Sequence, residues 1–416
     1  MQNGTRHLKQ HFWRDQGITF LLITLFLCLV VYRYKHNLPS MSDFFRAYYP
    51  AGRLIIENPY ALYDLSDTVV YGFVNLPILA YLFTPFSYLD KTVAGVSFTL
   101  LGITSVIFSI FILVDFTGLK SWRRLSLIAI MLFTIPISNS IWIGNTTHFT
   151  LLLLIGSFDS LKAKGEVLGG VLLAIASLIK LPLLFLMLLF VIRQRWRALL
   201  ASCLTLLSAV TLSVVLCGWN LNLIWFQRCI LSFSGKVVGA YNVQSVDSFL
   251  VRLLTAAPLN SWDMYEASWQ LKLVRYSLFL LFIGGTFWTL FRSKHSTTPE
   301  AESLEFSIFL CLAIISSPIS WTHYYLLLLL PISLLISLPW MTLHKRTWSA
   351  AIAVVILLIS TPPVKNVSVS NPVVAAFIRN FLVSHYFWGG VLLLGILLMA
   401  RWKSPQMLLE QQIHEG

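Results

Sequence analysis

Charged residues are scarce in this chain: only 11% of its 416 residues are Asp, Glu, Lys or Arg, whereas 57% are hydrophobic. A chain of this composition would aggregate in water, which excludes a soluble globular protein. Hydrophobic segments this frequent are typical of membrane proteins, in which helices satisfy the hydrogen-bonding groups of their own backbone. We therefore expect an all-α, polytopic integral membrane protein.

Acidic residues are scarcer still, with 17 Asp and Glu against 30 Lys and Arg, for a formal charge of +13. In a soluble domain this excess would indicate nucleic-acid binding. Membrane proteins, however, collect Lys and Arg in short cytoplasmic loops, where these residues set the orientation of the helices. We interpret the basicity as a signal of orientation and expect no nucleic-acid partner.

The sequence also lacks the usual signs of a cofactor. Its five cysteines are too widely spaced for a metal site, and His, Asp and Glu form no cluster with the spacing of metal ligands. It contains neither a glycine-rich phosphate loop nor a Rossmann-like domain. We expect no metal, no cofactor and no site for a cytosolic nucleotide sugar.

Apolar segments, by contrast, are abundant. About 20 helical residues cross a bilayer, and shorter pieces occur where a helix is broken or re-entrant. We predict about twelve such segments, several of them short enough to be half-helices. The first has no small-residue cleavage site, which favours an anchor over a removable signal peptide. The segments are residues 17–34, 93–114, 125–138, 147–161, 167–179, 182–192, 198–216, 271–291, 304–317, 323–339, 348–360 and 384–400.

Lys and Arg occur in every second connection between these segments, and all of those connections are short. The positive-inside rule places these connections, and both termini, in the cytoplasm. The longer loops 35–92, 217–270 and 361–383 are then extracytoplasmic. The cytoplasmic set is Arg6, Lys9 and Arg14; Lys120, Arg123 and Arg124; Lys162 and Lys164; Arg193, Arg195 and Arg197; Arg292 and Lys294; Lys345 and Arg346; and Arg401 and Lys403.

This topology gathers distant polar segments at the extracytoplasmic face: Asp43, Gly144–His148, Lys180, Asn242–Ser245 and Ser320–His323. Polar residues are costly to place near lipid, so a set gathered at one depth is a candidate functional site. The alternative is that these are ordinary interfacial loops.

Asp43 opens the run from Ser42 to Glu57, which has the pattern of an interfacial amphipathic helix with Ser42 as its N-cap. A carboxylate in the first turn could simply favour the positive end of the helix dipole, worth a fraction of a kcal/mol. It could also take a proton from an incoming hydroxyl as a general base. Its position does not decide between the two.

Lys180 interrupts an apolar sequence at the expected outer junction between two short helices. It could snorkel toward water, or it could bind a lipid phosphate as a compact cation. The aromatic residues after the Asn58-Pro59 turn, Tyr60 among them, could line a sugar site or belong to an aromatic belt. Residues 75–86 are apolar but contain two prolines, so we expect a re-entrant or interfacial segment.

Residues 147–150 and 322–325 echo each other, because each has a Thr-His pair that opens a predicted helix and precedes a run of leucines. A histidine at a helix N-terminus gains nothing there from being charged, which favours a neutral or ligand-paired imidazole for His148 and His323. His323 also follows a Ser-Pro break, and such breaks in membrane proteins usually line a cavity.

Taken in order, the motifs between about residue 40 and about residue 340 resemble glycosyltransferase family 87. This GT-C-fold family contains polyprenyl-phosphate-mannose-dependent α-1,2-mannosyltransferases. The sequence departs from the family pattern at Asn75-Leu76-Pro77, at Gly144–Thr147 and at His323-Tyr324, where the family often has Tyr-Pro-Pro, Gly-Gln-x-Asn and His-His. The motifs are Asp43–Tyr49, Asn58-Pro59-Tyr60, Gly144-Asn145, Gly169 with Lys180 and Pro182, Arg195–Ala198, Asn242 with Gln244 and Ser245, and Ser317–His323.

The resemblance implies that residues 1–416 form one GT-C-type transmembrane domain in a bacterial plasma membrane, with its active site outside the cytoplasm. It implies a hexosyltransferase that moves a hexose, mannose in the family's best-known members, from a polyprenyl-phosphate sugar to a lipid-linked or glycan acceptor among membrane lipids. The catalytic residues would be Asp43 and His323. The residues expected to bind substrate are Arg46, Tyr48, Tyr49, Tyr60, Asn145, His148, Lys180, Asn242, Gln244 and Trp321.

One carboxylate suffices for this chemistry, because a phosphate leaves as a stable anion and needs no acid to protonate it, unlike the leaving group of a glycosidase. Asp43 would deprotonate the acceptor hydroxyl in an inverting displacement. Lys180, His323 and Arg46 would stabilise the departing phosphate.

The main alternative is a polytopic transporter or lipid flippase, whose ionisable groups would lie near the midplane with access from both sides. A structural membrane scaffold is a third possibility, but it leaves the broken helices unexplained.

Overall fold

The computed structural model describes residues 17–32, 41–64, 72–255, 257–292, 298–338, 345–367 and 369–415. Within these ranges the chain is almost entirely helical, and its only strands are the two-residue pair β1 (Lys236–Val237) and β2 (Tyr265–Glu266). The predicted all-α fold is therefore confirmed. The predictions about Arg6, Lys9, Arg14 and Lys294 fall outside the described residues.

Several helices are long and apolar enough to cross a bilayer. The described part of the chain contains five such helices. Because several helices can cross the bilayer, the protein is a polytopic membrane protein. They are α4 (Lys91–Thr117), the pair α5 (Ser121–Phe133) and α6 (Ile135–Ile143) taken as one segment, α10 (Trp196–Cys217), α14 (Trp269–Arg292) and the apolar part of α19 (His385–Glu415).

The other predicted segments form shorter helices, several of them broken. The stretch near Lys180 is divided into α8 (Glu166–Ile179), η4 (Leu181–Leu186) and α9 (Met187–Ile192), and the stretch after His323 into η6 (Thr322–Leu328) and α16 (Leu329–Ser337). Several of the predicted segments are thus short or broken helices, as their lengths indicated. The remaining segments are the helix Gly17–Tyr32, α7 (Thr147–Lys162), α15 (Pro299–Ser316) and α17 (Lys345–Ser360).

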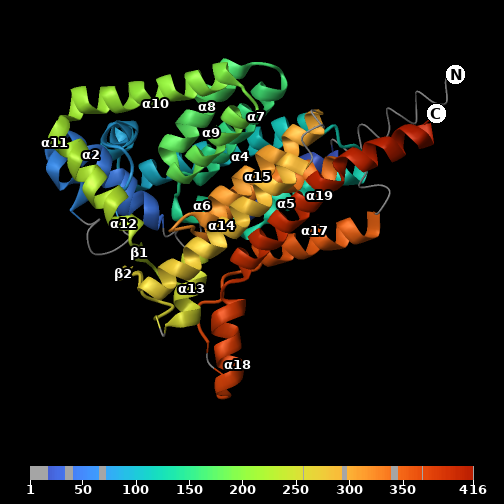
Figure 1. Ribbon diagram of the computed structural model, residues 1–416. Coiled ribbons are helices and arrows are strands. Elements are labelled where there is room, and N and C mark those ends of the chain that lie inside the picture. The colour runs from blue at the N-terminus through green and yellow to red at the C-terminus, as the bar shows by residue number, and fades with distance from the viewer. Residues whose placement is uncertain are drawn as a thin grey trace.

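The helices pack in two groups (Figure 1). In one, α8 lies between α7 and α10, and α7 also packs on α4; in the other, α19 packs on both α15 and α17. The groups meet where α15 contacts η4 and where η6 contacts α6 and α7. A continuous buried core reaches from Phe26 to Ala400, so the groups share one apolar interior.

The longer loops carry the remaining elements. α18 projects away from the rest of the molecule (Figure 1). The elements are η1 (Phe44–Tyr48), α2 (Tyr49–Glu57), η2 (Pro59–Tyr63), η3 (Pro77–Phe83) and α3 (Thr84–Ser87); α11 (Trp219–Trp225), η5 (Phe226–Leu231), α12 (Ser232–Ser234) and α13 (Val246–Leu254); and α18 (Pro372–Phe377) and η8 (Ile378–Leu382).

A buried ion cluster joins the two groups at the end of α7 and α8 that carries the predicted cytoplasmic loops. Glu305 on α15 is 1% exposed and accepts hydrogen bonds from Arg193 and from Arg401, the latter at 2.9 Å. Arg195 pairs with Glu302 beside it. Arg401 is completely buried, so its ion pair with Glu305 is shielded from water.

Replacing Glu305 by Gln is expected to destabilise the fold by about 3–5 kcal/mol, because it removes the buried carboxylate that pairs with both Arg193 and Arg401. The thermal midpoint of the purified protein in detergent measures the effect. Glu57→Gln is the matched control: it removes a solvent-exposed partner of Arg53 and should leave the midpoint nearly unchanged. Equal midpoints for the two variants would contradict a structural role for the cluster.

Candidate active site

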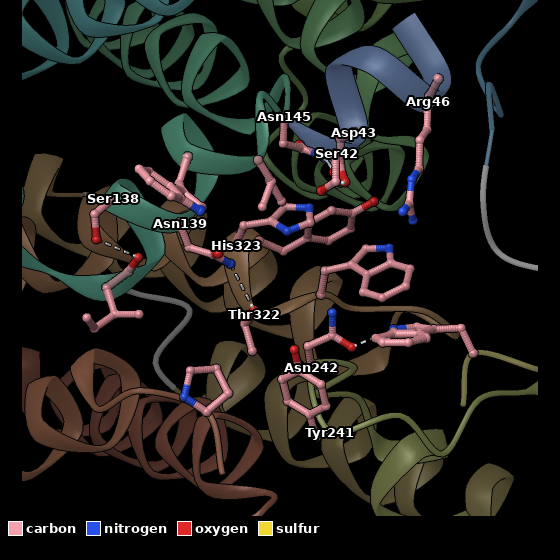
Figure 2. A pocket seen from close by; sticks show the side chains of 18 of the residues that line it. Ser42, Asp43, Arg46, Ser138, Asn139, Asn145, Tyr241, Asn242, Thr322 and His323 are labelled. Atoms are coloured by element: carbon pink, nitrogen blue, oxygen red, sulfur yellow. Dashed lines mark hydrogen bonds between the residues drawn. The ribbon is translucent and has the colours of Figure 1, made fainter. Parts of the chain in front are cut away.

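A polar cavity of about 740 Å³ lies at the opposite end of α7 and α8 from the ion cluster. Segments far apart in the sequence form its walls, and Figure 2 shows Ser42, Asp43 and Asn145 across the cavity from Tyr241 and Asn242. The predicted site residues that line it are Asp43, Arg46, Tyr48, Asn145, Lys180, Asn242, Trp321 and His323. The topological prediction that these segments lie together is thus matched by the geometry.

Asp43 stands at the start of the first loop helix, directly before the π-helical turn η1. The predicted helix over residues 42–57 is present as η1 and α2, and it ends at Asn58 before Pro59 as expected. The predicted N-cap is wrong: Ser42 already lies inside the helix, and its hydroxyl donates to Asp43 Oδ1 at 3.4 Å. The helix start is fixed instead by a backbone bond from Met41 N to Trp142 O at 3.1 Å.

The turn between α6 and α7 brings Asn145 to Asp43. Gly144 has a φ of +67°, and a Cβ at this position would lie 2.6 Å from Cβ of Phe44. Only glycine permits both the left-handed conformation and this close approach. Although the turn differs from the family's Gly-Gln-x-Asn pattern, it therefore keeps the glycine that the packing requires.

The amide of Asn145 connects the carboxylate to the cation. Its Nδ2 donates to Asp43 Oδ2 at 2.5 Å, while its Oδ1 accepts from Lys180 Nζ at 3.1 Å. Thr147 fixes the amide by donating to the same oxygen from its backbone nitrogen and its hydroxyl. One hydrogen-bond network thus holds both Asp43 and Lys180. The Asp43 carboxylate still has acceptor positions that this network does not use.

Lys180 occupies a break between α8 and η4 that the sequence makes necessary. Pro182 has no N–H to donate to Leu178 O, so the helix cannot continue through it. The side chain of Asn75, from the first loop, satisfies the exposed carbonyls instead and donates to Ile179 O at 2.9 Å. Lys180 is 7% exposed, and its ammonium lies 4.4 Å from the ring centroid of Tyr324.

Burial raises the pKa of the Asp43 carboxyl above its ordinary value of 3.8. The hydrogen bond from Asn145 and the positive charge of Lys180 oppose this shift, in that order of importance. The carboxylate is therefore more basic than one in water, and its two partners offset part of the shift. A carboxylate with this balance suits a general base.

Backbone hydrogen bonds between residues 242–244 and residues 320–322 hold the wall of the cavity that carries His323. Gln244 N donates to Ser320 O at 2.5 Å and Thr322 N to Asn242 O at 2.9 Å, around a bridge between Val243 and Trp321. The imidazole of His323 is parallel to the Trp321 ring, and its Nε2 is buried without a hydrogen-bond partner among the described residues. A buried nitrogen in this state is available to a ligand.

Four residues expected in the site, Tyr49, Tyr60, His148 and Gln244, do not line the cavity. The hydroxyl of Tyr49 donates to Leu89 O, and Tyr60 is 58% exposed. His148 points toward α4, where its Nε2 would lie 2.5 Å from a Cβ at Gly102. Gln244 is completely buried, donates to Val383 O at 2.7 Å just before α19, and accepts from Phe387 N of α19 at 3.3 Å.

The structure adds lining residues that the sequence did not predict to bind substrate: Asn139, Tyr241, Trp262, Tyr324 and Lys365. Trp262 donates to Asn242 Oδ1 at 2.9 Å, and Asn139 donates to Thr322 Oγ1 at 3.3 Å. Aromatic rings with neighbouring amides and hydroxyls are suited to the apolar faces and hydroxyl groups of a sugar. Among the described lining residues, Asp43 is the only carboxylate.

Comparison with known proteins gives the site a family context. A curated relative from Mycobacterium tuberculosis, "Polyprenol-phosphate-mannose-dependent alpha-(1-2)-phosphatidylinositol mannoside mannosyltransferase", is 25% identical over 308 residues, covering 70% of this chain and 68% of the relative. The profile of glycosyltransferase family 87 matches residues 73–318, a range that includes Asn145, Lys180 and Asn242 but neither Asp43 nor His323. Because this match covers more than half of the chain, the protein belongs to glycosyltransferase family 87.

Proposed function

We propose that this glycosyltransferase moves a hexose, mannose by analogy with the M. tuberculosis relative, from a polyprenyl-phosphate sugar to a lipid-linked or glycan acceptor at the extracytoplasmic face. The observation that carries the proposal is the Asp43–Asn145–Lys180 network, in which one carboxylate and one buried cation face the same cavity. This arrangement suits displacement of a phosphate by a hydroxyl.

Lys180 binds the donor phosphate in this proposal. Its ammonium has one hydrogen bond to Asn145 Oδ1 and the ring of Tyr324 beneath it, so a donor position remains for a phosphate oxygen. His323 Nε2 is a second polar group that could contact the phosphate or the sugar. Together they stabilise the negative charge that grows on the leaving phosphate.

Asp43 acts as the base at the other side of the anomeric carbon. The acceptor O–H proton passes to the carboxylate while the acceptor oxygen bonds to the anomeric carbon. The bond from that carbon to the phosphate oxygen breaks, and its electron pair leaves with the phosphate. Attack opposite the leaving group inverts the anomeric configuration, and no second carboxylate is needed.

The donor's isoprenoid chain would lie in an apolar recess of about 210 Å³, which shares Tyr48 with the polar cavity and includes Ile179, the residue before Lys180. Its outer edge is formed by Leu82 and Leu101, which are 61% and 51% exposed. A chain in this recess would lead from the bilayer to the phosphate position at Lys180.

A transporter or flippase would need groups reachable from both sides of the membrane. The polar cavity lies at one end of α7 and α8, and the buried ion cluster closes the packing at the other, which favours the transferase.

Purified protein incubated with a panel of polyprenyl-phosphate sugars and membrane-lipid acceptors tests the proposal. We expect transfer from the mannosyl donor and none from nucleotide sugars. Liposomes containing the same preparation are assayed in parallel for substrate flux. Flux without any transfer would favour the transporter and contradict the proposed function.

Asn145→Leu is expected to move the acidic limb of the pH profile of kcat/KM to higher pH. The substitution removes a hydrogen bond to the Asp43 carboxylate and thereby raises its pKa. Because the base must be deprotonated, activity is then lost at a higher pH as the pH falls. Asn139→Leu removes a lining amide without contact to Asp43 and should alter KM while leaving the limb in place. An unmoved limb in Asn145→Leu would contradict the assignment of Asp43.

A further inference from the structure

The side-chain amide of Asn242 has a direction that its neighbour fixes. Asn242 lines the polar cavity, and the indole Nε1 of Trp262 donates to its Oδ1 at 2.9 Å. An indole N–H can only donate a hydrogen bond, so the atom that it meets must be the oxygen of the amide and not the nitrogen. The NH₂ group of Asn242 therefore points away from Trp262.

This NH₂ group faces the reaction site. Figure 2 shows the side-chain nitrogen of Asn242 turned from its bond with Trp262 toward the side of the cavity that carries Asp43 and His323. The nitrogen has no hydrogen-bond partner among the described residues, and Asn242 is half-buried. A donor in this state gains a hydrogen bond when a ligand oxygen approaches it.

The backbone of Asn242 is held as firmly as its side chain. Its carbonyl accepts from Thr322 N at 2.9 Å. On either side of it, the carbonyls of Ala240 and Val243 accept from the guanidinium of Arg252 at 2.9 Å each, and Arg252 is only 1% exposed. Backbone and amide are thus ordered before a substrate arrives, so Asn242 can bind a ligand group without first losing conformational freedom.

A second lining amide, that of Asn139, is not fixed in the same way. Its side-chain partner is Thr322 Oγ1 at 3.3 Å. A hydroxyl both donates and accepts, so this bond does not decide which end of the Asn139 amide faces the cavity. The indole of Trp262, by contrast, gives Asn242 a defined polarity: it offers a donor to the substrate.

The transferred hexose is the substrate group that reaches Asn242. In the proposed function the donor phosphate lies at Lys180 and the attacking hydroxyl at Asp43, and Asn145 bonds to both of these residues on one wall. A hexose placed between them must project from this wall into the cavity. Asn242 lies across the cavity from Asp43 (Figure 2), where it meets the projecting part of the ring.

We propose that Asn242 is a specificity-determining residue that donates a hydrogen bond to one hydroxyl oxygen of the transferred hexose, and that Trp262 is the positioning residue that aims it. The inference rests on the proposed function and adds the group that recognises the donor sugar. A donor sugar without this hydroxyl leaves the N–H without a partner and binds more weakly.

Calorimetric titration of the purified protein with mannosyl farnesyl phosphate tests the inference, together with derivatives in which each ring hydroxyl in turn is replaced by hydrogen or by fluorine. Fluorine can accept a hydrogen bond but cannot donate one, so it keeps the property that Asn242 requires. At one ring position we expect the deoxy derivative to bind about tenfold more weakly than the parent and the fluorinated derivative to recover about threefold of this loss.

Trp262→Phe keeps an aromatic ring and removes the N–H that fixes the amide. The deoxy and fluorinated derivatives at that position should then bind within about twofold of each other. Asn242→Ala removes the donor itself and should give the same result, which keeps the test open should Trp262→Phe not fold. Trp219→Phe is the matched control, because Trp219 is 67% exposed on α11 and does not line the cavity; it should preserve the recovery by fluorine.

Recovery by fluorine at no ring position of the sugar would overturn the inference. A recovery that persists unchanged in Trp262→Phe and Asn242→Ala would also overturn it, because another donor in the cavity would then make the contact. Failure of the unaltered protein to bind the mannosyl donor is a different result: it contradicts the proposed function itself.

Discussion

Asp43→Asn is expected to lower sugar transfer by about 10²–10⁴-fold, the usual contribution of a general base. The amide has the size of the carboxylate and can still accept the hydrogen bond from Asn145 Nδ2, so the turn at Gly144 should keep its position. What it loses is the ability to take the acceptor proton. Initial rates with saturating donor and acceptor measure the change.

Asp64→Asn is the control for this experiment. Asp64 lies in the same loop, but it is 64% exposed and pairs with Arg228. We expect its rate to stay within about twofold of the unaltered protein, as is usual for surface substitutions. If Asp43→Asn, correctly folded and inserted, transfers sugar at the unaltered rate, Asp43 is not the base, and its position merely favours the helix dipole.

Lys180→Met is expected to raise the donor KM and lower kcat, with a combined loss of about 10²–10³-fold in kcat/KM for the donor. Methionine keeps most of the volume of the lysine side chain and removes its charge, so the loss reports on the phosphate contact. The same change raises the pKa of Asp43, because the positive charge of Lys180 lowers it in the native site. The acidic limb should therefore also move to higher pH.

Lys162→Met separates a phosphate contact from a general effect of charge. Lys162 ends α7 at the other end of the helix from the cavity, where its ammonium lies 4.1 Å from the ring centroid of Phe116. Its removal should leave the donor constants unchanged. Unchanged donor kinetics in Lys180→Met would instead contradict the phosphate contact and leave Lys180 a structural partner of Asn145.

Much of the fold follows from hydropathy and proline. The apolar runs predicted α4, α10 and α14 nearly at their observed ends, and the start of α19 but not its end, since this helix continues from residue 400 to Glu415. A long apolar helix is the main way to bury such a run in lipid. Pro182 predicted the break at Lys180. The sequence could not reveal that Asn75, from a loop about a hundred residues earlier, would satisfy the carbonyls that this proline leaves open.

The sequence predicted which segments form the site, but not which side chains of those segments point into it. Alternating basic loops placed Asp43, Lys180 and His323 on one face, and the structure brings all three to one cavity. Gln244 and His148 were predicted at that face too, yet Gln244 binds the backbone of α19 at Phe387 and His148 packs on α4. Tyr241 and Trp262 were not singled out because aromatic residues near a membrane surface usually belong to an interfacial belt.

The stereochemistry of transfer tests the account most directly. With a donor of known anomeric configuration, NMR of the product shows whether that configuration is inverted or retained. Asp43 is the only carboxylate among the described lining residues, so a single displacement with inversion is predicted. Retention would require a double displacement through a covalent glycosyl intermediate and would contradict the assignment of Asp43 as a base that deprotonates the attacking acceptor.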